Sequence, residues 1–411
     1  MLQCRRRPFC LPLLQVVVGV HVRHQQEATS STVTVTTTAG ATVTITKTTI
    51  LMIQFWTGTT PTQDKIVQTR RQIIEPMKAL TSPIFISTDP KTGRRHQSLK
   101  YVVDAIATDG DAQKHQEKRP SLFVSNHQLL GFDSFLVVNE LLEACNNDND
   151  DIFVRPLTHP FLSTVDEDFT LPGSDFLETY GCLPATPKTF YNCMKHNQTC
   201  LLFPGGAKES FHKSGEEYTL KAWSETLDFV RVAAKYNATI IPFSSVGAAE
   251  SALFLDQIQI PFARNTNTNL AKLGDSILKS IIPTQGIPYN ARYDAAKAKA
   301  KTSNNDGGGG SRTKNKKEEI SFPFVVPKGL IPERHYFLFD TPIDTTTINH
   351  KDKIQCRSIY NNIKRTIQQG CYDLVQAKES DPFGNNGGQR LVYERLWKNE
   401  QAPTFPIDLL N

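Results

Sequence analysis

The chain has 411 residues, of which 39% are hydrophobic and 21% are charged. These proportions are close to those of folded globular proteins, so wholesale disorder is excluded. The net charge of +5 comes from 46 basic and 41 acidic residues, a surplus too small to predict a nucleic-acid-binding protein. A weakly basic protein of this kind is compatible with an anionic membrane surface.

The eight cysteines include no C-x-x-C pair, which argues against a zinc ribbon or a thioredoxin-like redox site. Cys193, His196 and Cys200 are near one another in sequence, but residues of an amphipathic helix and the next strand belong more often to a core. We therefore predict no metal site. The longest apolar runs, 9–20 and 50–56, are shorter than the roughly 18 residues that span a bilayer. Membrane contact is expected to be peripheral.

Residues 1–60 differ in composition from the rest of the chain. Arg5, Arg6 and Arg7 precede an apolar stretch, and a Ser/Thr-rich tract follows with no acidic residue between Glu27 and Asp64. The basic and apolar start is typical of a secretory signal, whereas the acid-poor continuation is typical of an organellar transit peptide. A wrongly assigned start or a disordered tail is the alternative. In each case we expect this segment to lie outside the fold.

Alternating elements follow. Apolar residues at helical spacing predict a helix over 64–80. Strands are expected at 121–125, 151–155, 200–203 and 239–243, and helices between them at 135–145, 188–196 and 216–236. In the last of these helices the apolar residues share one face. This alternation predicts an α/β fold, with a central mixed or mostly parallel sheet flanked by helices.

A low-complexity stretch at 295–319, which contains four consecutive glycines, predicts a flexible insertion. It lacks the GK[ST] ending of a phosphate-binding loop. A strand at 336–339 and a helix at 353–378 are expected after it. The predicted organisation is therefore a core at 61–294, an insertion at 295–319, and a C-terminal part of the same domain at 320–411.

The first candidate site follows the strand at 121–125. His127 can serve as a general base, and a carboxylate such as Asp133 can orient it and stabilise the imidazolium. Six positions along a helix rotate a side chain by about 600°, so the two cannot share a helical face. They are expected to meet only if His127 lies in a loop, Asp133 begins the next helix, and Gly131 eases the turn. Asn126 is expected to support the loop. Two ordinary loop residues are the alternative.

The second candidate site follows the strand at 200–203. Pro204, Gly205 and Gly206 predict a tight turn with accessible main-chain N–H groups, and Lys208 adds a positive charge close by. A plain turn between a strand and a helix is the alternative. Both sites follow strands, and in open α/β sheets the carboxyl ends of neighbouring strands face a shared crevice.

In this order and separation the two sites resemble blocks one and three of the glycerolipid acyltransferase superfamily, whose signatures are NHxxxxD and FPEGTRS. The fit is to one branch, the phytyl ester synthase/diacylglycerol acyltransferase family, in which the histidine and the acid are one residue further apart. In that branch the third block reads P-G-G followed by a basic residue and Glu, as at Pro204–Glu209. Residues 181–185 resemble its second block and 337–343 its C-terminal strand.

The resemblance implies a fatty acyl transfer from acyl-CoA or acyl carrier protein to diacylglycerol or phytol. It implies His127 as the base, Asp133 as its orienting acid, and an acceptor or oxyanion site at Asn126, Gly205, Gly206, Lys208 and Glu209. No bound cofactor is expected. Since Lys208 is a point charge and not the bidentate fork that Arg offers, an unphosphorylated acceptor is favoured. A lysophospholipid or glycerol-phosphate acyltransferase is the enzymatic alternative.

The expected partners are lipid substrates, a membrane or lipid-droplet surface and, as a candidate, acyl carrier protein. The expected location is the plastid, at thylakoid or plastoglobule, with the endoplasmic reticulum as the alternative. No G-x-S-x-G elbow occurs in the sequence, so only the acyltransferase half of the family is expected here. A non-catalytic lipid-droplet coat protein is a further alternative, although such a coat has no use for the base.

Overall fold

The computed structural model describes residues 32–36, 42–46, 63–107, 119–131, 133–146, 153–158, 177, 179–210, 212, 215–224, 228–254, 325–327, 329, 331–397 and 400–411. The predicted insertion at 295–319 and most of the segment 1–60 lie outside the described residues. The domain boundaries therefore stay a prediction.

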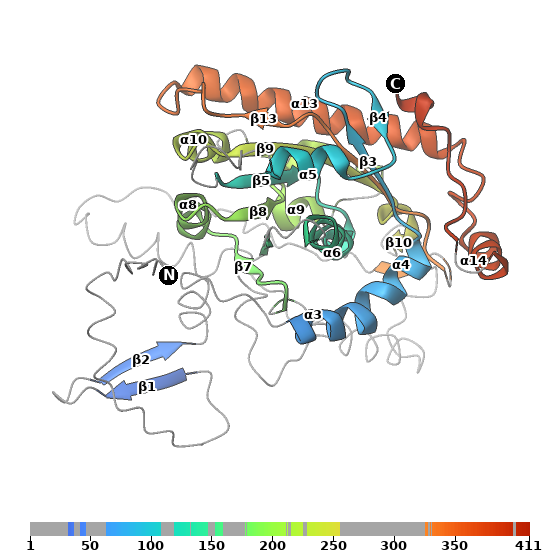
Figure 1. Ribbon diagram of the computed structural model, residues 1–411, viewed down its shortest axis with the longest axis horizontal. Helices are drawn as coiled ribbons and strands as arrows, with labels where there is room; N and C mark the ends of the chain where they lie inside the picture. Colours follow the sequence, from blue (N-terminus) through green and yellow to red (C-terminus); the bar gives the residue numbers. More distant parts are fainter. Residues whose placement is uncertain are drawn as a thin grey trace, which may run out of the picture.

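The described strands form one large sheet and two separate pairs (Figure 1). They are β1 (Thr32–Thr36), β2 (Thr42–Thr46), β3 (Ile84–Thr88), β4 (Arg95–His96), β5 (Ser121–Ser125), β6 (Val154–Thr158), β7 (Leu183–Pro184), β8 (Thr199–Leu202), β9 (Thr239–Val246), β10 (Ala252–Phe254), β11 (Val325–Pro327), β12 (Tyr336–Phe339) and β13 (Ile343–Asp344). The large sheet has the order β4-β3-β12-β9-β5-β8-β6-β7, with β13 beside β9, while β1 pairs with β2 and β10 with β11.

The sheet is mixed. Neighbours from β9 through β5, β8 and β6 to β7 run parallel, and β12 is parallel to β3. The direction reverses between β12 and β9, which are antiparallel. The predicted fold class, a mixed or mostly parallel sheet flanked by helices, is confirmed.

Helices cover both faces of the sheet. They are α3 (Gln63–Thr69), α4 (Glu75–Thr81), α5 (Lys100–Ala107), α6 (Asp133–Asn146), α8 (Pro187–Lys195), α9 (Gly206–Ser210), α10 (Phe229–Lys235), α13 (Lys353–Lys378) and α14 (Gly387–Leu396). A π-helical segment, Arg70–Ile74, joins α3 to α4. Short 3₁₀ turns lie at Leu129–Gly131, Leu220–Ala222, Ala249–Ser251 and Ile407–Leu410.

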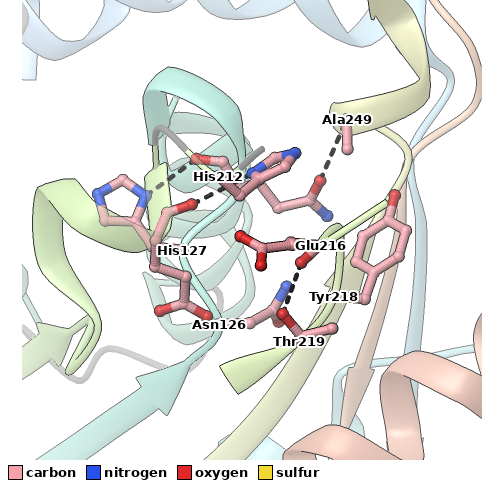
Figure 2. A pocket seen from close by; sticks show the side chains of 9 residues that line it. Asn126, His127, His212, Glu216, Tyr218, Thr219 and Ala249 are labelled. Carbon is pink, nitrogen blue, oxygen red and sulfur yellow. Dashed lines mark hydrogen bonds between the residues drawn. The ribbon is translucent and has the colours of Figure 1, made fainter. Parts of the chain in front are cut away.

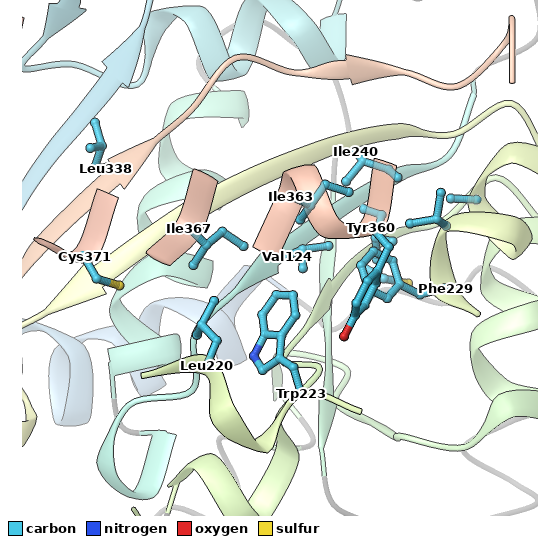
Figure 3. Close-up of a cluster of buried hydrophobic side chains, with 14 of the residues drawn as sticks. Val124, Leu220, Trp223, Phe229, Ile240, Leu338, Tyr360, Ile363, Ile367 and Cys371 are labelled. Atoms are coloured by element: carbon cyan, nitrogen blue, oxygen red, sulfur yellow. The ribbon is translucent and has the colours of Figure 1, made fainter. Parts of the chain in front are cut away.

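Side-chain alternation along the strands produces two cores. Leu122 and Val124 of β5 pack with α8, α10 and α13 on one face, and Phe123 packs with α5 and α6 on the other. Figure 3 shows the first core, in which Ile363 and Ile367 of α13 lie over the strands. Burying each such side chain stabilises the fold by about 1.5–3 kcal/mol. These layers hold the strand ends at fixed positions.

Local signals explain where the best-predicted helices begin. The Asp352 carboxylate accepts hydrogen bonds from the N–H groups of Ile354 and Gln355, so it caps α13. Thr186 caps α8 in the same way, through a bond from the N–H of Thr189. The predicted strands at 121–125 and 336–339 and the helix at 353–378 are confirmed.

Two elements differ from prediction. The strand expected at 151–155 is β6, three residues further on. The single helix expected over 216–236 is wrong, because only the 3₁₀ turn Leu220–Ala222 and α10 are helical among its described residues. Trp223 has an extended backbone, with φ −67° and ψ 117°. Leu220 and Trp223 are buried as a helical stripe would be, but Leu220 reaches the core from the 3₁₀ turn and Trp223 from the extended residue that follows it.

Other sequence expectations concern metals and membranes. Cys193 and Cys200 are buried in the core, whereas His196 is exposed. Within the described ranges, no three His, Cys, Asp or Glu side chains are grouped so that they could bind a metal ion. No helix in those ranges has both the length and the hydropathy required to cross a bilayer.

Substitution of Gly370 tests the packing of α13 on β9. A Cβ atom at this position would lie 2.3 Å from Ser244 Oγ, whose hydroxyl donates to the Ile367 carbonyl. We expect Gly370→Ala to destabilise the fold by about 1–3 kcal/mol through overpacking, although alanine is the better helix former. The matched control is Gly388→Ala in α14, where the nearest atom lies 3.8 Å away. Urea unfolding distinguishes the two, and a gain in stability in both would contradict this packing.

Candidate active site

Three adjacent parallel strands end at the candidate site. In the order β8-β5-β9 they run in the same direction, so the loops that follow them emerge at one edge of the sheet. These loops carry His127 after β5, the turn at Gly205 after β8, and Gly247 after β9. The observed strand order therefore places the two sequence sites at one edge of the sheet, as the sequence predicted.

Two amides hold the loop after β5 to the end of β9. The Asn126 amide donates to the Ser245 carbonyl (2.9 Å), and its oxygen accepts from the Ser245 N–H (2.8 Å). The Gln128 Oε1 accepts from the N–H groups of Ala248 and Ala249. Asn126 therefore supports the loop as predicted, while an acceptor-binding role for it stays a prediction.

His127 lies in the loop between these two amides. Its Nδ1 is 3.0 Å from the Gln128 carbonyl oxygen. Because a carbonyl only accepts hydrogen bonds, Nδ1 carries the proton and Nε2 keeps its lone pair. Burial lowers the pKa of His127 to about 4, so the imidazole is neutral at pH 7. These are the protonation state and tautomer that a general base needs.

The surroundings of the imidazole come from both sequence sites. The Phe203 ring lies 4.6 Å away, centroid to centroid. Gly131, with a φ of +68°, passes so close that a Cβ atom there would be 2.7 Å from His127 Cε1. Gly131 thus allows both the turn and the approach of the ring.

Asp133 is the first residue of α6, as predicted, and is buried. Its Oδ2 accepts a hydrogen bond from the Ser245 hydroxyl (3.0 Å), and its Oδ1 has no hydrogen-bond partner. Burial raises the pKa of Asp133 to about 7, and the Ser245 bond offsets part of this rise. In this structure His127 is oriented by a main-chain carbonyl and not by Asp133, so the orienting role of Asp133 stays a prediction.

The turn after β8 is closed by a main-chain bond, in which the N–H of Gly206 donates to the Phe203 carbonyl (3.0 Å). The oxyanion roles of Gly205 and Gly206 and the acceptor-site roles of Lys208 and Glu209 stay predictions. Lys208 is exposed on α9. Glu209 is buried, and burial raises its pKa to about 8.

A small pocket opens beside His127, with about 240 Å³ of empty space that includes part of the open solvent (Figure 2). The motif residues Asn126, His127 and Glu209 line it. Sequence reasoning assigned no role to the other lining residues, which are Gln128, His212, Glu216, Tyr218, Thr219 and Ala249. Gln128 and Ala249 lie in the loops after β5 and β9, whereas His212, Glu216, Tyr218 and Thr219 come from the connection after α9, part of which the sequence wrongly predicted as a helix.

Known proteins with similar sequences are phytyl ester synthases. The chain is 31% identical over 335 residues to phytyl ester synthase 2, chloroplastic, of Arabidopsis thaliana, which is 80% of this chain and 40% of that protein. It is 28% identical over 284 residues to phytyl ester synthase 1, chloroplastic, of the same plant, covering 68% and 35% of the two chains. The chain thus spans about two fifths of the length of these relatives.

Two further comparisons add less. No protein-family model matches the sequence. The crystal structure of the 1-acyl-sn-glycerophosphate (LPA) acyltransferase PlsC from Thermotoga maritima aligns with 80% of this chain and 96% of its own, at 12% identity and a TM-score of 0.32. At that TM-score the likeness supports no conclusion. The sequence matches nevertheless confirm the family resemblance: the chain is a homologue of the phytyl ester synthases over four fifths of its length.

Proposed function

We propose that this chain is an O-acyltransferase, which moves a fatty acyl group from an acyl thioester to a neutral lipid alcohol, diacylglycerol or phytol. The observation that carries this proposal is a neutral His127 whose Nε2 keeps its lone pair, at the edge where β5 and β8 end. The similarity of this chain to two Arabidopsis phytyl ester synthases supports phytol as one acceptor.

In the proposed reaction, His127 Nε2 takes the proton of the acceptor hydroxyl while the alkoxide oxygen attacks the thioester carbonyl. A new C–O bond forms and the C–S bond breaks. The leaving thiolate then takes the proton from the imidazolium, which restores the neutral base. Asp133 is proposed to stabilise the imidazolium when its carboxyl group is ionised.

The donor is proposed to be acyl-CoA or acyl carrier protein, and no bound cofactor is required by the proton transfers. Because both acceptor and product are insoluble, a membrane or lipid-droplet surface is the proposed site of action. The chloroplastic relatives support a plastid location. Lysophosphatidate is the acceptor that must be compared, because Lys208 keeps one exposed positive charge beside the turn even though it lacks the bidentate fork of Arg.

Label transfer from acyl-CoA to diacylglycerol, phytol and lysophosphatidate, offered together, tests the proposal. We expect the label in a neutral ester, with phytyl ester or triacylglycerol identifying the acceptor. Label mainly in phosphatidate would overturn the neutral-lipid assignment. The assay is repeated with acylated acyl carrier protein as the donor. No product with either donor would favour a non-catalytic lipid-droplet coat protein.

A further inference from the structure

Glu209 is a buried carboxyl group between the two motifs. The Trp223 indole Nε1 donates a hydrogen bond to its Oε2 at 3.0 Å, and the main chains of His127 and Gly205 lie close enough to lower the pKa of the carboxyl group. One side chain therefore lies where the loop after β5, the turn after β8 and the irregular segment that carries Trp223 meet. Its position in the short helix α9, Gly206–Ser210, brings it to the pocket wall.

The space that a side chain at Gly205 would occupy is filled by the side chain of Glu209. A Cβ atom at Gly205 would lie 2.0 Å from Glu209 Oε2 and 2.6 Å from Glu209 Cβ. Backbone conformation does not explain this glycine, because the positive φ of the turn, +54°, belongs to Gly206. At Gly206, in contrast, an added Cβ atom meets nothing within 4 Å.

The FPEGTRS signature carries its own glutamate at the position of Gly205. In this chain the space next to that position holds a glutamate side chain that comes from one helical turn further on. We propose that Glu209 is a positioning residue for the base: its carboxyl group stands in for a side chain at 205 and fixes the main chain of His127 against the turn after β8. The inference rests on the proposed function only for its activity readout.

Three variants and a control test this. Glu209→Gln keeps the size of the side chain but replaces one acceptor oxygen with an NH₂ donor, which cannot accept from the indole or from the main-chain N–H groups nearby. Gly205→Glu alone places two side chains in one space. The double variant Gly205→Glu/Glu209→Gly exchanges the residues at unchanged composition and charge. Glu379→Gln, at an exposed position after α13, is the matched control.

We expect about 10- to 100-fold lower kcat for Glu209→Gln and for Gly205→Glu, because small displacements of a base cost rate steeply. The exchanged variant should recover at least about tenfold over Gly205→Glu, since the carboxyl group is restored to the same space. Glu379→Gln should match the wild type. Thermal unfolding of each variant separates loss of fold from loss of position.

The second readout is the NMR signal of the His127 Cε1–H group, assigned with His127→Gln. We expect it to shift in Glu209→Gln and to return toward the wild-type position in the exchanged variant. The NMR signal can be measured even if the wild type esterifies no acceptor. Failure of the proposed function is therefore distinguishable from failure of the positioning role of Glu209. An unchanged His127 signal in folded Glu209→Gln, or an exchanged variant no better than Gly205→Glu in both readouts, would overturn the inference.

Discussion

His127→Ala is expected to lower the rate of ester formation by about 10²- to 10⁴-fold, the usual contribution of a positioned general base. The substitution removes Nε2, the unprotonated imidazole nitrogen, and with it the group that takes the proton of the acceptor hydroxyl. Initial rates of label transfer at saturating donor measure this, together with thermal unfolding to confirm the fold. A variant within about threefold of the wild type would remove His127 from the mechanism.

The pH profile distinguishes the base from its predicted partner. The pKa of His127 is lowered to about 4, so protonation of this base inhibits only well below pH 6. The pKa of Asp133 is raised to about 7, and only the ionised form stabilises the imidazolium. Activity should therefore rise with pH through about 7. In Asp133→Asn this rise should be absent and the rate lower throughout, whereas an unchanged profile would exclude Asp133 from catalysis.

Arg334→Met is expected to cost about 3–5 kcal/mol of unfolding free energy, the range for breaking a buried ion pair. Arg334 is fully buried and bonds the Asp381 carboxylate (3.1 Å). It also donates to the carbonyl oxygens of Ser82, Ala402 and Pro403. The substitution leaves Asp381 buried without its cation and leaves three carbonyl groups with one donor fewer.

The matched control for this prediction is Arg231→Met. Arg231 forms an ion pair with Asp228 at the surface, where such pairs contribute about 1 kcal/mol or less. Urea unfolding of both variants at neutral pH gives the comparison. Equal losses in the two would show that the buried cluster around Arg334 contributes no more than a surface pair.

Elements with an unambiguous local pattern could be predicted from the sequence. The helix Lys353–Lys378 has a capping Asp352 and a long apolar stripe, and the strand Ser121–Ser125 is a short run bounded by a proline and a polar loop. The helix expected over 216–236 failed for a tertiary reason. Trp223 is buried and donates a hydrogen bond to Glu209. Its spacing from the other apolar residues of this segment resembles that of a helix, although its backbone is extended.

The site was predictable to the extent that strand order determines it. His127 and the turn at Gly205 follow neighbouring strands, so their proximity could be inferred before the structure. The hydroxyl of Ser245 on Asp133 was not foreseen, because nothing local marks one serine at the end of β9 as its partner. The partner of Glu209 was not predictable either, because the Trp223 indole that donates to its carboxyl group comes from a separate segment.

The place of β12 in the sheet has a consequence for biosynthesis. This strand, Tyr336–Phe339, lies between β3 and β9, so it is an interior strand supplied late in the chain. A ribosome completes β3 and β9 long before residue 336 emerges, and until then each presents an unpaired edge to other chains. Truncated chains that end before β12 should therefore aggregate, even though every residue of the two sequence motifs is still present.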